Sequence, residues 1–324
     1  MLTFYAAGKG GLRPYEHPAP RRLPPALVWI DMLQPSLKEE RRVEHMLGIN
    51  VPTREELQEI EVSSRLYKES GALFMTATVI SQADTPTPET TAVTFVLING
   101  RLISLRYCAL QPFKMFLSRQ QRQACPTRGE AVLMGLLDAI VDRIADILER
   151  IGEDMDAVSQ EIFKVNEGGG AVQRSGSLQD YLRRIGRNGD MTSKASESLV
   201  SLARLLAFLE QAERPDGEQT TAQLDMLNRD VKSLSSHAQF LSDKATFLLS
   251  ATLGMVNIEQ TDIIKIFSVA AVMFLPPTLV ASIYGMNFEF MPELHWVGGY
   301  PLAILLMIVS ALLPYRFFKR RGWL

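Results

Sequence analysis

Two long runs without a charged residue lie near the end of this 324-residue chain, at residues 266–288 and 296–315. A helix needs about 20 apolar residues to cross the hydrocarbon core of a bilayer. Both runs are long enough, and their length disfavours the alternative that they are two buried core helices of a soluble protein. We therefore predict two transmembrane helices, at about 264–284 and at 296–315.

The basic residues around these runs predict their direction across the membrane. Four of them follow the second run and one precedes the first: Arg316, Lys319, Arg320, Arg321 and Lys265. The residues that connect the runs contain two glutamates but no lysine or arginine. Because loops rich in Lys and Arg stay in the cytoplasm, we expect both termini there. Residues 285–295 then form an external loop, and residues 316–324 form a basic cytoplasmic tail.

The bulk composition excludes several classes of function. A formal charge of −2 argues against a nucleic-acid binder, which usually carries a basic excess. Cys108 and Cys125 are too few for a disulfide framework, as is usual for cytoplasmic protein, and the four histidines lack zinc-ligand spacing. No phosphate-binding loop and no catalytic constellation occurs, so we expect neither an enzyme nor a cofactor.

Residues 1–125 are expected to form a mixed α/β domain. The segments 26–32, 72–81 and 92–108 are rich in β-branched and aromatic residues, which favours strands. Asn99-Gly100 predicts a type I′ hairpin turn within the last of them. Two capping boxes, Ser36 with Glu39 and Thr53 with Glu56, predict helix starts between the strands.

Residues 126–217 are expected to form an antiparallel pair of helices, the first beginning near residue 129 and the second covering about 177–213. Their acidic faces are more often solvated surface than cation sites. A third helix is predicted over residues 218–284, continuous into the first span and on the order of 100 Å long. Its apolar residues alternate in steps of three and four from Leu224 to Met255, as in a coiled-coil seam. Such a seam needs partners, either other helices of this chain or copies of it.

The predicted external loop begins with Tyr284-Gly285-Met286-Asn287, FEFMPEL follows it, and PYRFFKRRGWL stands at the C-terminus. In these segments the sequence resembles the CorA family of magnesium channels. The resemblance is strongest over residues 255–324, and residues 52–65 also resemble the enterobacterial subgroup. The resemblance implies a funnel-shaped homopentamer in the bacterial inner membrane, with the α/β domain in the cytoplasm and five first spans around a pore. The implied function is passive entry of Mg²⁺, with Co²⁺ and Ni²⁺ as further candidates.

The Gly-Met-Asn residues are the expected selectivity filter of this family. Mg²⁺ sheds its water reluctantly, so a ring of Asn287 amides, with the Gly285 and Met286 carbonyls, would accept hydrogen bonds from the hydrated ion. Helix C-termini add negative partial charge, and Glu289 and Glu293 would attract cations to an outer vestibule. The alternatives are a turn asparagine and plainly solvated glutamates.

The resemblance also implies a pore face along the first span. The residues that match it are Thr261, Ile264, Phe267, Ala271, Leu275 and Thr278. Thr278 would contact the hydrated ion, and the large apolar side chains would gate by dewetting. Thr261 stands where many family members have asparagine, a loss for which the neighbouring Asp262 could compensate. Asp225 is the expected regulatory site for cytoplasmic Mg²⁺.

Two other readings stay open at this point. The first is a Zn²⁺ transporter of the same superfamily, because selectivity among hydrated ions cannot be read from the residues. The second is a membrane-anchored sensor or scaffold that conducts nothing and uses its long helix to assemble partners.

Overall fold

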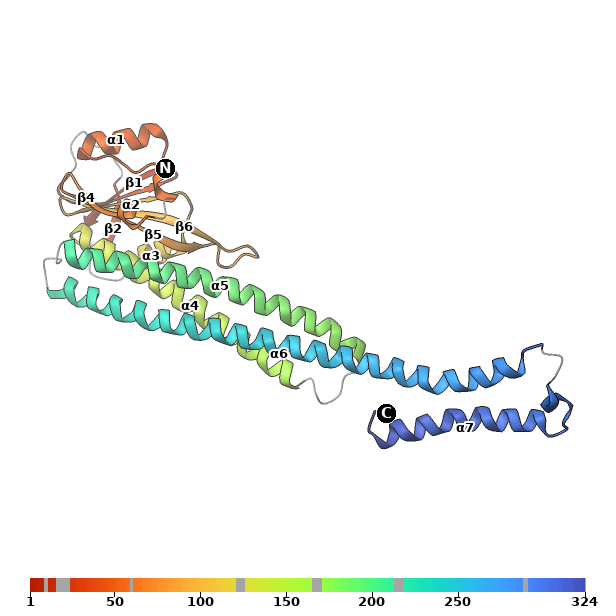
Figure 1. Cartoon of the computed structure of the whole chain (residues 1–324). Helices are drawn as coiled ribbons and strands as arrows, with labels where there is room; N and C mark the ends of the chain where they lie inside the picture. The colour runs from red at the N-terminus through yellow and green to blue at the C-terminus, as the bar shows by residue number, and fades with distance from the viewer. Residues whose placement is uncertain are drawn as a thin grey trace. The chain divides into compact units, whose positions relative to one another are not determined.

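Figure 1 shows the computed structural model, which describes residues 1–8, 11–15, 24–58, 61–120, 126–164, 171–212, 218–287 and 291–323. The chain divides into two compact units. The first comprises Met1–Lys164 with Tyr181–Leu248, and the second comprises Val165–Asp180 with Leu249–Leu324. The long helix α6 contributes to both.

A seven-stranded sheet forms the centre of the first unit. Its strands are β1 (Leu2–Gly8), β2 (Gly11–Pro14), β3 (Leu27–Leu33), β4 (Leu66–Glu69), β5 (Ala72–Ser81), β6 (Glu89–Ile98) and β7 (Arg101–Arg106). They lie in the order β2-β1-β3-β7-β6-β5-β4. Only β3 and β7 pair in parallel; the other neighbours are antiparallel. The sheet confirms the predicted α/β class.

The predicted β6–β7 hairpin is confirmed. Asn99 and Gly100 have φ of +49° and +70°, the left-handed pair that a type I′ turn requires. The sequence reasoning missed β1 and β2. The small residues Ala6, Ala7 and Gly8 lower the strand propensity of β1, and its place in the sheet comes from pairing with β3.

The two predicted capping boxes have different outcomes. Ser36 and Glu39 cap α1 (Leu37–Leu47), where the Ser36 amide donates to the Glu39 carboxylate at 2.8 Å. Thr53 and Glu56 exchange the same pair of bonds at 2.8 and 3.3 Å. They begin only a single 3₁₀ turn, η1 (Glu56–Gln58). A cap satisfies the first amides of a turn, but extension needs an apolar face to bury.

A buried ion pair ties β3 to β7. The Arg106 guanidinium donates to both Asp31 oxygens, at 2.6 and 3.0 Å, and the Ser104 hydroxyl donates to the same carboxylate at 2.8 Å. The Trp29 indole donates to Ser104 at 2.9 Å, and Arg106 lies 4.3 Å from the Phe113 ring centre. Because this network is fully hydrogen-bonded, it fixes the register of the parallel pair.

Helices cover both faces of the sheet. One face carries a core closed by α1 and η1, including Val43 and Leu57. The other packs on α3 (Gln111–Gln120) and α4 (Gly129–Lys164), where Phe113 and Phe116 lie beside Trp29. The sequence reasoning did not predict α3 or the short α2 (Val62–Arg65).

The helix α5 (Ala171–Ala212) begins earlier than the predicted residue 177. Its Arg184 binds Asp154 and Glu161 of α4, at 2.5 and 3.1 Å. Its Ser201 hydroxyl accepts a hydrogen bond from the Thr78 backbone amide of β5 at 2.9 Å. This bond satisfies a backbone donor on the part of β5 that β4 does not pair. The helical pair is therefore bound to the sheet.

The helix α6 (Glu218–Tyr284) carries the predicted seam. Eight of the ten seam positions are buried: Leu224, Leu227, Val231, Ala238, Leu241, Ala245, Leu248 and Thr252. A Cβ built on Gly152 of α4 would lie 3.7 Å from Leu241, and one on Gly189 of α5 would lie 4.0 Å from Ala245. In the first unit, therefore, the partners of the seam are helices of the same chain, the first of the two alternatives left open.

The β5–β6 loop is also bound to α4. Asp84 accepts bonds from Arg143 at 2.6 Å and from Arg150 at 2.8 Å. Both bonds hold the pKa of the Asp84 carboxyl below its usual range, and the bond from Arg150 has the larger effect. Because its folded-state pKa is lowered, the stabilisation is present above the ordinary aspartate range and is lost as pH falls through the folded-state value.

The second unit contains the end of α6, the turn η3 (Pro292–His295) and α7 (Gly299–Arg320). Both α6 and α7 are long and apolar enough to cross a membrane. The helix α7 starts later than the predicted residue 296, because the residues before Gly299 form η3 and a turn. At its other end it continues past the uncharged run to Arg320.

The start of α4 generates a stability prediction. The Gly129 amide donates to the Gly100 carbonyl at 2.7 Å, and a Cβ on Gly129 would lie 2.4 Å from backbone atoms of Arg101 and Leu102. We expect Gly129→Ala to destabilise the protein by about 1–3 kcal/mol, because backbone must move. Thermal unfolding of the purified full-length chain measures the change.

Gly186→Ala is the matched control. A Cβ on Gly186 of α5 meets nothing within 4 Å, and alanine favours a helix over glycine by about 0.8–1 kcal/mol. The two variants should therefore shift the unfolding midpoint in opposite directions. A midpoint of Gly129→Ala at or above that of the wild type would contradict the close approach of α4 to the sheet.

Candidate ion pathway

The first span ends at the Gly-Met-Asn segment. The Gly285 amide still donates to the Ala281 carbonyl at 3.0 Å, and the Met286 amide donates to Ile283 at 3.3 Å. A Cβ on Gly285 would lie 3.2 Å from the Ala281 oxygen, so glycine lets the chain leave the helix without crowding its last turn. The helix therefore finishes within one turn of Asn287.

Asn287 lies exposed immediately after this end. Within the described residues, its side chain makes no hydrogen bond or ion pair. An unpaired amide at a helix C-terminus combines an oxygen acceptor with the negative end of the helix dipole. That combination suits a cation, and in particular the water hydrogens around one.

All six residues predicted for the pore face are exposed in the single chain: Thr261, Ile264, Phe267, Ala271, Leu275 and Thr278. Val269 is the one buried residue in the described part of this span, at 3% exposure. Thr278 follows it by about two and a half turns and so lies on the opposite side of α6. The predicted face is therefore available to bind something outside the chain.

The two threonines on this face present their oxygens as acceptors. The Thr278 hydroxyl donates to the Phe274 carbonyl at 2.7 Å, and the Thr261 hydroxyl donates to the Asn257 carbonyl at 2.8 Å. Because each hydrogen is used within the helix, the remaining lone pairs can accept bonds from water. A hydrated cation offers only such donors.

The Pro276-Pro277 pair interrupts the backbone hydrogen bonds of α6, but not on the predicted pore face. A proline lacks an amide hydrogen, so the Val272 and Met273 carbonyls lose their usual donors four residues on. Pro276 follows Val269 by about two turns and lies on the same side of the helix. Both prolines are half-buried.

Asp262 does not compensate for the smaller Thr261 in the way expected. It binds Lys265 at 2.7 Å. It also precedes Val269 by about two turns, which places it on the side away from Ala271 and Thr278. The structure therefore does not bring Asp262 onto the predicted pore face.

The predicted vestibule can be followed only in part. Glu289 lies outside the described residues. Glu293 lies in η3, where the backbone alone is described. Asp225 is exposed on α6, next to the buried Leu224. Across the described residues, no group of three or more His, Cys, Asp or Glu could hold a metal ion within one chain.

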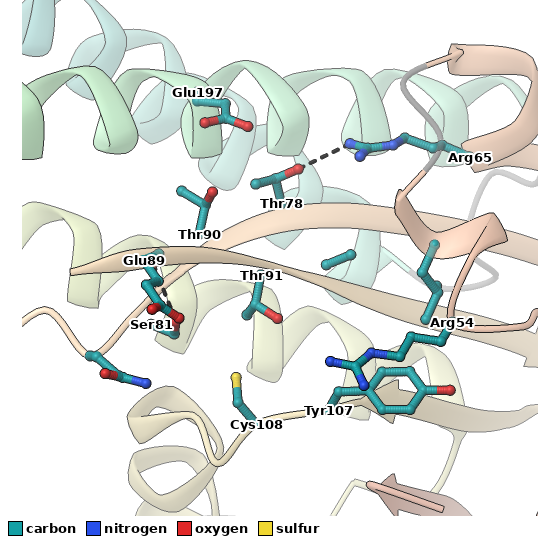
Figure 2. A pocket seen from close by; sticks show the side chains of 13 residues that line it. Arg54, Arg65, Thr78, Ser81, Glu89, Thr90, Thr91, Tyr107, Cys108 and Glu197 are labelled. Atoms are coloured by element: carbon teal, nitrogen blue, oxygen red, sulfur yellow. Dashed lines mark hydrogen bonds between the residues drawn. The ribbon is translucent and has the colours of Figure 1, made fainter. Parts of the chain in front are cut away.

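Sequence reasoning missed one polar feature of the molecule, a cavity in the α/β domain (Figure 2). Its lining residues come from segments far apart in the chain, so no local motif marks it. The sheet brings most of them together, and the packing of α5 on it adds Glu197.

Comparison with known proteins agrees over nearly the whole chain. The family described as CorA-like Mg²⁺ transporter protein matches residues 25–320. The chain is 37% identical over 302 residues to the magnesium transport protein CorA of Pectobacterium atrosepticum, covering 92% of both chains. It is 38% identical over 299 residues to the CorA proteins of Salmonella typhimurium and Escherichia coli, again covering 92% of both chains.

Solved structures agree in fold. The complete CorA magnesium transporter of Methanocaldococcus jannaschii matches with a TM-score of 0.78 at 17% identity, covering 100% of this chain and 99% of that one. Full-length CmaX matches with a TM-score of 0.70, covering 100% and 98%. With an uncharged pair of spans, an exposed Gly-Met-Asn end and these relatives, the chain belongs to the CorA family of Mg²⁺ transporters.

Proposed function

We propose that this protein is a homopentameric channel through which Mg²⁺, and also Co²⁺ or Ni²⁺, enters a bacterial cell passively. The observation that carries the proposal is Asn287 at the C-terminal end of an uncharged span, exposed and without a side-chain partner among the described residues. Five such ends around one axis would place five amide oxygens and five helix dipoles against a hydrated ion. The Gly285 and Met286 carbonyls complete this filter.

The exposed apolar surface of α6 supports the assembly. Phe267, Leu275 and Ile264 are 71%, 66% and 64% exposed. Rings of such side chains around a narrow axis exclude water when they close and thereby stop ion flow. In this proposal they form the gate, and Thr278 is the polar position between the gate and the filter.

The driving force is the membrane potential. Two positive charges that cross about 100 mV gain roughly 4.6 kcal/mol when the cell interior is negative. The absence of any phosphate-binding motif in the sequence agrees with transport that uses no ATP. An inner-membrane topology with both termini in the cytoplasm is supported by the basic residues in the last turns of α7 and just after it.

Control by cytoplasmic Mg²⁺ is the remaining part of the proposal. Asp225 is exposed and has no ion-pair partner among the described residues. One carboxylate binds Mg²⁺ weakly, so a regulatory site at Asp225 requires an oxygen ligand from a neighbouring subunit.

Asn287→Ala tests the filter. We expect selective Mg²⁺ uptake into proteoliposomes to fall at least about tenfold, the effect of losing roughly 1.4 kcal/mol of ion stabilisation. Native mass spectrometry should still count five subunits. Asn50→Ala, an exposed asparagine of the α/β domain, should leave uptake unchanged. Wild-type uptake by Asn287→Ala would remove Asn287 from the filter, and absence of uptake by the wild type itself would favour the non-conducting scaffold.

Two substitutions of Thr278 test whether its hydroxyl oxygen contacts the hydrated ion. Thr278→Val removes the oxygen acceptor at nearly constant volume, whereas Thr278→Ser keeps it. We expect the valine variant to lower Mg²⁺ uptake several-fold, on the order of one lost hydrogen bond, and the serine variant to stay close to wild type. Equal uptake by the two variants would remove Thr278 from the ion path.

The choice of ion is tested by flux under an imposed potential. Mg²⁺ influx should rise as the vesicle interior is made more negative, and Zn²⁺ should not replace it. Fluorescent indicators for each ion inside the vesicles provide the measurement. Zn²⁺ flux without Mg²⁺ flux would establish the zinc alternative.

A further inference from the structure

A polar cavity of about 470 Å³ lies in the α/β domain, apart from the proposed ion path (Figure 2). Its walls come from the residues around η1 and α2, from the β5–β6 hairpin, from the segment after β7 and from α5. All of these belong to the first compact unit. The cavity is therefore formed within one chain.

One side of the cavity is positively charged. The Arg54 guanidinium lies 5.3 Å from the centre of the Tyr107 ring, and Arg65 donates to the Thr78 hydroxyl at 3.0 Å. Burial, and then the nearby Glu40 carboxylate, raise the pKa of Tyr107, so its phenol is neutral. A guanidinium held over a neutral ring is already oriented for planar, two-pronged recognition of a phosphate or carboxylate.

The opposite side carries two carboxylates, Glu89 on β6 and Glu197 on α5. In Figure 2, Glu89 and Arg54 lie at opposite sides of the cavity. Neither glutamate side chain has a hydrogen-bond or ion-pair partner among the described residues, and there Arg54 has only the Tyr107 ring. The charges of Arg54, Glu89 and Glu197 thus line one cavity without neutralising each other.

Hydroxyl groups also line the cavity. Thr78 and Ser81 are 6% and 5% exposed, and Thr90 and Thr91 are half-buried. The Ser81 hydroxyl donates to the Glu89 carbonyl at 3.2 Å. These oxygens can hydrogen-bond a polar ligand along its length.

This charge distribution restricts the ligand. A free anion would be repelled by the glutamates, and a free cation would be repelled by the arginines. Two carboxylates are too few to hold a metal alone, and the described residues contain no larger cluster. Proteins usually bind Mg²⁺ through one or two carboxylates together with the phosphates of a bound compound.

We propose that this cavity binds a phosphate compound together with its Mg²⁺ ion. Arg54 and Arg65 hold the phosphate, and Glu89 and Glu197 hold the hydrated ion on the other side. The inference rests on the proposed function only for the choice of Mg²⁺. It adds to that function a site that responds to the Mg²⁺-loaded phosphate pool of the cell.

Titration calorimetry of the full-length protein tests the site, with inorganic pyrophosphate as the probe, in the presence and absence of Mg²⁺. The wild type should bind the Mg²⁺ complex at least about tenfold more tightly than pyrophosphate alone. Arg54→Gln should weaken binding of both forms at least about tenfold, whereas Glu197→Gln should weaken only that of the Mg²⁺ complex.

Arg41→Gln on α1 and Glu210→Gln on α5 are matched controls, because both residues are exposed and lie outside the cavity. No binding, equal binding with and without Mg²⁺, or equal losses in the cavity and control variants would overturn the inference. Such results leave the Asn287→Ala uptake test unaffected. Conversely, a protein that binds pyrophosphate as expected but takes up no Mg²⁺ would overturn the proposed channel and still support the phosphate site.

Discussion

The backbone of a chain in hydrocarbon must satisfy its own hydrogen bonds, and the second unit follows from this constraint. Helices do so within one segment, and in the described part of the chain α6 and α7 are the two helices with the required length and composition. Pro276-Pro277 is the exception in α6, where two carbonyls lose their amide donors. Both prolines are half-buried, and Pro276 lies on the side of Val269, away from Ala271 and Thr278 on the opposite side of the helix.

The two parts of α6 satisfy their apolar surface in different ways. From Leu224 to Leu248 most of the seam is buried against helices of the same chain, with Gly152 of α4 next to Leu241 and Gly189 of α5 next to Ala245. In the span, the large apolar side chains stay exposed in the isolated chain. Lipid can cover part of that surface. A face that also carries threonine oxygens is better covered by copies around a water-filled path.

The sequence predicted the features that are set locally. The Asn99-Gly100 pair predicted the β6–β7 hairpin, and the length of the uncharged runs predicted the two spans. The spacing of apolar residues in steps of three and four predicted the seam of α6. The 3₁₀ turn after Thr53 and the pairing of β1 were not predictable in this way, because tertiary contacts decide them. The pairing of Asp262 with Lys265 was likewise not predicted, because it depends on the position of Asp262 around the helix. The cavity lined by Arg54 and Glu197 was invisible to motif analysis, because α5 reaches the sheet from far along the chain.

The chemistry of the proposed path favours passage over retention. A conducting site must attract an ion and also release it, and a cluster of carboxylates would hold Mg²⁺ too firmly. The predicted pore face offers neutral oxygens instead, from Thr278 and Asn287. Asp262, just before the uncharged run, is paired with Lys265 off that face. Neutral acceptors bond the water hydrogens and leave the ion hydrated. The cost of stripping water from Mg²⁺ is thereby avoided, and the potential alone can drive the ion inward.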